Sequence, residues 1–60
     1  MKKHTLKKIN RIREIMLKKG YARYTEEALN EYYMINGNYD NISELQILNT
    51  CIAMAQREVD

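Results

Sequence analysis

The sequence is poor in the residues that cross-link or interrupt small folds. Its 60 residues include one cysteine, one histidine, two glycines and no proline, tryptophan or phenylalanine. A single cysteine excludes a disulfide framework within the chain. One cysteine and one histidine are also too few for a structural zinc site, which normally uses about four nitrogen and sulfur ligands. We therefore predict no metal and no cofactor, and expect stability to come from helix packing, self-association or both.

Long hydrophobic runs are missing as well. No stretch approaches the roughly 18 consecutive apolar residues of a membrane-spanning helix. The basic start is not followed by the apolar segment of a signal peptide, because charged residues interrupt it throughout. These interruptions are Arg11, Arg13, Glu14, Lys18 and Lys19. We expect one cytoplasmic domain covering residues 1–60, with no membrane span and with residues 1–4 as a flexible basic tail.

The scarcity of glycine and proline also disfavours a β-sandwich or barrel, which needs frequent turns. The apolar spacing instead predicts an all-α fold, a small three-helix domain with helices at about 5–19, 25–36 and 42–58. Thr5 and Thr25 are candidate N-caps, and Gly20 and Gly37 suit the left-handed residue that follows a helix.

The first predicted helix is amphipathic. One side carries an apolar stripe, and the opposite side carries a charged ridge at i, i+4, i+7 and i+11. The stripe consists of Leu6, Ile9, Ile12, Met16 and Leu17, with Ile15 at its margin. The ridge consists of Lys7, Arg11, Glu14 and Lys18.

The dipeptide Asn36-Gly37 leaves a second structure open, because it is also typical of a β-hairpin turn. Strands at 32–35 and 39–42 are the competing prediction. We favour the helix, since the sequence EYYMI does not alternate and an isolated hairpin is marginally stable in water.

The third predicted helix has two possible starts and two apolar sides. Asn41 with Glu44, or Ser43 with Gln46, would each form a capping pair. One apolar side has the 3-4-3-4 spacing of a helix seam. It contains Leu45, Leu48, Ile52, Ala55 and Val59.

The second apolar side of that helix contains Ile47 and Met54, with Cys51 between the two sides. Two other short helices can hardly cover both sides. We therefore predict a homodimer through the third helix, with Ile47, Cys51 and Met54 as the self-association residues. The alternative is that Ile47 and Met54 are isolated exposed apolar residues, which are common.

Charge is divided unevenly along the chain. Residues 1–24 hold nine of the ten Lys and Arg residues and one acid, for a net charge of +8, whereas residues 25–60 have a net charge of −6. Three interpretations compete: the two halves neutralise each other, the basic helix binds an acidic protein, or it binds nucleic acid.

No pattern of catalytic chemistry is recognisable. His4 lies near the terminus, Cys51 lies in an apolar helical stretch, and no small-molecule substrate is evident. We predict a non-enzymatic regulatory or inhibitory interaction protein that binds an acidic protein surface through its basic first helix. The alternative is a nucleic-acid-binding accessory protein or transcriptional regulator that uses the same residues. These residues are Lys7, Lys8, Arg11, Lys18 and Lys19.

Overall fold

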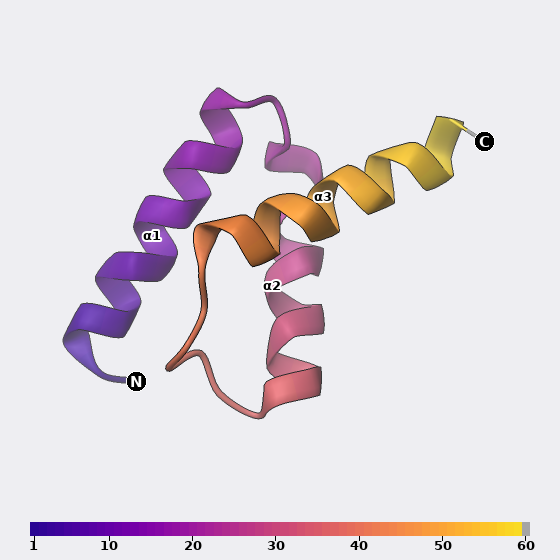
Figure 1. The fold of residues 1–60 in the computed structure, drawn as a ribbon. Coiled ribbons are helices and arrows are strands. Elements are labelled where there is room, and N and C mark those ends of the chain that lie inside the picture. The colour runs from indigo at the N-terminus through magenta and orange to yellow at the C-terminus, as the bar shows by residue number, and fades with distance from the viewer. Residues whose placement is uncertain (60) are drawn as a thin grey trace.

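The computed structural model describes residues 1–59 and consists of three α-helices (Figure 1). Helix α1 spans Lys3–Lys18, α2 spans Ala22–Asn36 and α3 spans Glu44–Val59. The described residues contain no β-strand, so the predicted all-α, three-helix fold is confirmed. The hairpin alternative is wrong, because the first of its two strands lies inside α2.

The three helices pack unequally on one another. Helix α3 crosses α2, and these two share the most extensive contact, whereas α1 contacts α3 least. The C-terminal turns of α3 extend past the other two helices (Figure 1), which gives the molecule its elongated shape of 38 × 24 × 15 Å. Part of α3 therefore has no helix of the same chain beside it.

The turn between α1 and α2 is built on Gly20. Its φ of 87° lies in the left-handed region that glycine adopts without steric cost. The Gly20 amide donates a hydrogen bond to the Leu17 carbonyl at 3.1 Å, and the Tyr21 amide donates to the Met16 carbonyl at 2.8 Å. This pair of bonds is the Schellman motif, so the predicted end of the first helix is confirmed.

The helix starts differ from those predicted. Thr5 and Thr25 are not N-caps but buried residues inside α1 and α2. The Thr25 hydroxyl donates to the carbonyl of Tyr21 at 2.9 Å, so its polar group is satisfied within the helix. Lys3 and His4 lie in the first turn of α1 rather than in a tail.

The start of α3 uses the second of the two predicted capping pairs. The Ser43 amide donates to the Gln46 side-chain oxygen at 3.2 Å, and the Gln46 amide donates to the Ser43 hydroxyl at 3.3 Å. This reciprocal pair is a capping box. Immediately before it, Ile42 is fully buried, and Tyr39 packs against the core as well, so both side chains anchor the connection from Gly37.

The core lies between the three helices and draws on all of them. Its partly buried margin includes Ile15, Tyr21 and Leu48. Its fully packed members are Ile9, Ile12 and Met16 from α1; Ala28, Leu29 and Tyr32 from α2; Ile42 from the connection; and Ile47, Cys51 and Met54 from α3.

The assignment of Ile47, Cys51 and Met54 to a self-association surface is wrong. Their exposed fractions are 1%, 0% and 8%, because they form the stripe through which α3 packs on the rest of the chain. A helix that crosses another contacts it over few turns, so a short i, i+4, i+7 stripe is enough. The apolar surface that α3 leaves exposed is on its other side, where Leu45 is 64% and Val59 86% exposed.

The burial of Ile47 generates a stability prediction. Ile47→Val removes one buried methylene and should lower the free energy of unfolding by about 0.5–1.5 kcal/mol, as is usual for this change in a core. Ile35→Val is the matched control, because Ile35 is exposed and the same change there should stay within about 0.5 kcal/mol. Urea unfolding of both variants measures the difference, and equal effects would contradict the packing of α3 described above.

Cys51 generates a second prediction. Burial raises the pKa of its thiol above the usual range, against a smaller opposing effect of the Thr25 side chain. A core of this size rarely supplies more than ~3–5 kcal/mol of stability. A reagent can reach the buried thiol only while the protein is unfolded, and this stability makes the unfolded state rare. A thiol reagent at mildly alkaline pH should therefore modify the folded protein about 10²–10³-fold more slowly than the urea-unfolded chain. Equal rates in the two states would place Cys51 at the surface.

Candidate functional site

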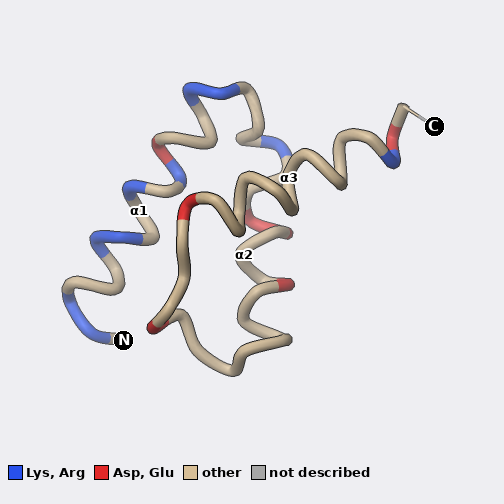
Figure 2. The backbone as a smooth tube through the Cα atoms, viewed as in Figure 1, with Lys and Arg blue, Asp and Glu red and all other residues tan. Residues whose placement is uncertain are grey.

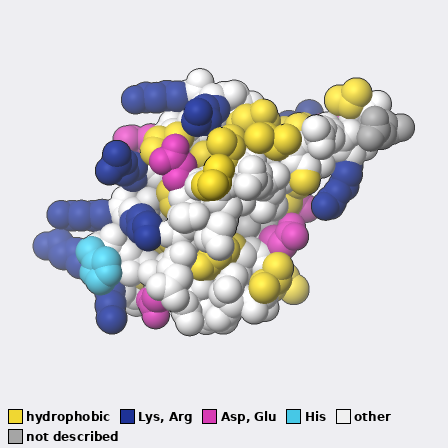
Figure 3. All heavy atoms as spheres, viewed as in Figure 1, with side chains coloured by type: hydrophobic (Ala, Val, Ile, Leu, Met, Phe, Trp, Pro, Cys, Tyr) yellow, Lys and Arg dark blue, Asp and Glu magenta, His cyan; other side chains and the backbone are white. Residues whose placement is uncertain are grey.

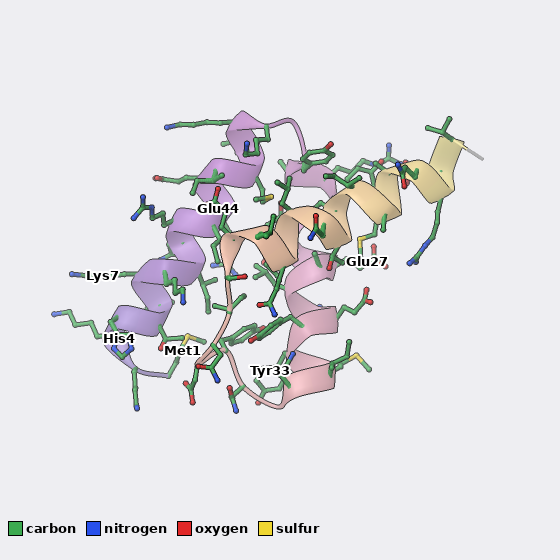
Figure 4. All side chains as sticks on the ribbon, in the orientation of Figure 1. Met1, His4, Lys7, Glu27, Tyr33 and Glu44 are labelled. Carbon is green, nitrogen blue, oxygen red and sulfur yellow. The ribbon has the colours of Figure 1, made fainter. Side chains whose placement is uncertain are left out.

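The exposed side of α1 carries a group of cations that is interrupted by Glu14. Figure 2 shows Lys and Arg positions distributed along α1, and Lys7 points away from the other two helices in Figure 4. Each of the five predicted binding residues is exposed, and none belongs to an ion pair within residues 1–59. We call this group the α1 cationic face. It consists of Lys7, Lys8, Arg11, Lys18 and Lys19.

Internal neutralisation involves two other cations. The Arg13 guanidinium donates two hydrogen bonds to the Glu26 carboxylate, from Nε at 2.9 Å and from Nη2 at 3.0 Å, and so ties α1 to α2. The hydrogen bond to Glu26 raises the pKa of Arg13. Arg23 pairs with Glu58 at 3.2 Å and ties α2 to α3. Arg13 was absent from the predicted site, and its pairing explains why it is structural.

The remaining acids lie mainly away from the α1 cationic face. Glu27 is on the side of α2 that faces away from α1 (Figure 4). The exceptions are Glu14, which lies within the ridge of α1, and Glu44, at the first position of α3. Glu44 is the one contributed by another helix. It lines a small hollow together with Lys8, Arg11, Ile12 and Ile15 of α1. The cationic side of α1 therefore borders the beginning of α3.

A second exposed surface lies on α3 and is apolar. We call it the α3 apolar strip, and it consists of Leu45, Leu48, Ile52, Ala55 and Val59. Figure 3 shows hydrophobic side chains gathered on this face next to the cations of α1. Tyr21, from the turn after α1, borders the strip and lines an open hollow of about 590 Å³ with Ile52, Ala55, Gln56 and Val59. The sequence predicts this seam, but the predicted self-association side of the helix was the other one, with Ile47, Cys51 and Met54.

One carboxylate fixes the projecting end of α3. Glu58 accepts a hydrogen bond from the Tyr24 hydroxyl at 2.6 Å and pairs with Arg23. The guanidinium carbon of Arg23 also lies 5.7 Å from the centre of the Tyr24 ring. These contacts orient the last turns of α3, and with them the end of the α3 apolar strip.

The tyrosines pack on the protein itself. Tyr32 is buried and its ring stacks on that of Tyr39 with a centroid distance of 6.3 Å, and Tyr33 contacts Tyr39 at 5.1 Å. None of these three residues lies on α1. The α1 cationic face is therefore not accompanied by a row of aromatic rings of the kind that stacks on bases.

Residues 1–59 contain neither a cluster of metal ligands nor a membrane-spanning helix. No group of three or more His, Cys, Asp or Glu side chains is arranged to hold a metal ion. None of the helices in this part of the chain has both the length and the apolar character needed to cross a membrane.

The contact between Tyr24 and Glu58 generates a pH prediction. The hydrogen bond to Glu58, with a smaller effect of burial, raises the pKa of Tyr24 above that of a free tyrosine. Because the folded value is the higher one, the bond contributes stability below the unfolded pKa and loses it as pH rises through the folded value. Tyrosinate absorbance is measured against pH for the wild type and for Tyr24→Phe, and the difference between the two curves reports the ionisation of Tyr24. This component should ionise at a higher pH than free tyrosine. Glu58→Gln should return that component to the ordinary range, and no change would contradict the contact.

Comparison with known proteins finds no family, no curated protein and no solved structure that matches this chain.

Proposed function

We propose that this chain is a small non-enzymatic interaction protein, of a regulatory or inhibitory kind, that binds an acidic protein surface through the α1 cationic face. The observation that supports this is that five exposed cations of one helix remain outside both internal ion pairs. Exposed charges at the edge of an interface accelerate encounter and select against partners of like charge. We propose the cytoplasm as the place of this function.

Nucleic-acid binding through the same face is the second candidate. Five cations along one helix would give a log–log salt slope of about −4 to −5 on duplex DNA. Two features favour the acidic protein: Glu14 lies within the ridge and would face phosphate, and Glu44 borders Lys8 and Arg11. The two candidates differ in the salt dependence of binding to DNA.

A homodimer through α3 would have to use the α3 apolar strip, since Ile47, Cys51 and Met54 are in the core. Light scattering across a range of concentrations tests it directly. A mass that stays monomeric at high concentration would remove the homodimer.

The proposed function predicts the effect of charge reversal. Lys7→Glu/Arg11→Glu/Lys18→Glu should reduce capture of the protein's partner from nuclease-treated host lysate at least about tenfold, since attraction becomes repulsion. The matched control is Lys2→Glu/Lys3→Glu/Arg57→Glu, which changes the net charge equally at other exposed positions and should keep capture. Circular dichroism should be helical for both variants. Undiminished capture by the first variant would overturn the proposed function.

Anisotropy titrations with random duplex DNA separate the second candidate. Binding that is tight at about 50 mM salt and falls steeply by about 200 mM would favour nucleic acid. Weak binding at both salt concentrations, with capture that survives nuclease, would favour the acidic protein.

A further inference from the structure

We propose that the α3 apolar strip is the seat for an amphipathic helix of the partner, one that carries carboxylates along one edge of its apolar seam. This inference rests on the proposed function, because α1 supplies the cations that would face those carboxylates. It adds the chemical form of the partner and a second surface that the cations alone do not define.

The strip has the geometry of a helix-packing seam. Leu45, Ile52 and Val59 are seven residues apart and form one row, and Leu48 and Ala55, also seven apart, form the second. Alternating steps of three and four residues are the a and d positions of a coiled coil, on which a second helix packs. Helix α3 has 16 residues and so offers about 24 Å of seam, or two heptads.

The strip is open at its two ends and partly buried between them, where Leu48 packs against the core. Leu45 and Val59, at its two ends, are both largely exposed, and Ile52 between them is half-buried. The hollow that Tyr21 forms with Ile52 and Val59 lies on the strip and can receive an apolar side chain of the partner. An apolar row of this length on a small protein is typical of an interaction surface.

The two edges of the strip differ in charge, and this difference favours an acidic occupant. On the α1 side, Lys8 and Arg11 line the hollow next to Glu44, and Lys19 immediately precedes the Gly20-Tyr21 turn. The next row on α3 in the other direction consists of Asn49 and Gln56, which are uncharged. An amphipathic helix with carboxylates on one flank would therefore match the surface in one orientation only.

A second copy of this chain matches the surface less well. The acid at the far end of α3, Glu58, is already bound to Arg23 and Tyr24. Within residues 1–59, a two-fold pairing of strips would offer the Lys8 and Arg11 edges only this already occupied carboxylate from the end of the partner helix. Charge complementarity selects a foreign acidic helix over self-association.

The test uses a synthetic helical peptide of about four to five turns, with Leu at its a and d positions and Glu along one flank. Titrated into the full ¹⁵N-labelled chain, it should shift the amide signals of the α3 apolar strip, Ile15 and Tyr21, and should leave those of the C-terminal end of α2 unchanged. A peptide with Lys in place of Glu should bind at least about tenfold more weakly.

Two double variants test whether the α3 apolar strip is the binding site for the peptide. Leu45→Gln/Val59→Gln should weaken binding of the Glu peptide at least about tenfold, since both side chains are apolar and exposed and neither supports the core. Met34→Gln/Ile35→Gln is the matched control, because it removes two equally exposed apolar side chains from α2 and should change binding less than about twofold.

Three outcomes would overturn the inference: equal binding of the Glu and Lys peptides, unchanged binding by Leu45→Gln/Val59→Gln, or a dimer of the free protein that this variant abolishes. The proposed function is decided separately, by capture from lysate. Suppose that Leu45→Gln/Val59→Gln still captures the partner from lysate and Lys7→Glu/Arg11→Glu/Lys18→Glu does not. The proposed function is then supported, and the α3 apolar strip is not the binding site for a partner helix. Capture that survives charge reversal overturns the proposed function, while the peptide titration still decides the seat.

Discussion

The packing of α3 on α2 is the constraint on which the rest of the structure depends. A chain of this size buries only about 60% of the surface that its unfolded form exposes, so it cannot enclose a helix that is apolar on two sides. Here the stripe around Cys51 enters the core, and the α3 apolar strip stays outside. The same packing that stabilises the fold therefore leaves an apolar surface exposed on α3.

The exposed positive charge of α1 follows from the small number of ion pairs between the helices. Arg13 binds Glu26 between α1 and α2, and Arg23 binds Glu58 between α2 and α3, so one ion pair supports each junction. Most of the other cations lie on α1 or beside its two ends, and Arg57 lies in the last turn of α3; none of them forms an ion pair within residues 1–59. Exposed pairs of this kind contribute little to stability, and their main effect is to fix the orientation of the helices.

Local chemistry made the helices predictable, whereas tertiary packing decided which sides they bury. Gly20 and Gly37 act within a few residues and were predicted correctly, and the capping pair Ser43 and Gln46 was one of two alternatives that the sequence left open. The sequence did not reveal that α3 buries the narrow stripe around Cys51 in the core and not the longer seam, because this depends on how α3 crosses α2. Arg13 was missed for a similar reason, since Glu26 is thirteen residues away in the chain.

The two exposed surfaces reinforce each other because they share a border. Exposed cations alone attract many anions weakly and lose much of that attraction to salt, while an apolar strip alone does not distinguish one apolar partner from another. Lys8 and Arg11 lie beside the start of α3. A single ligand that binds both surfaces would therefore have to carry carboxylates and an apolar seam together. Glu58 completes this arrangement from the opposite end, because it fixes the free turns of α3 while its own charge is occupied by Arg23. Selectivity would then arise from the combination, with neither surface needing high affinity by itself.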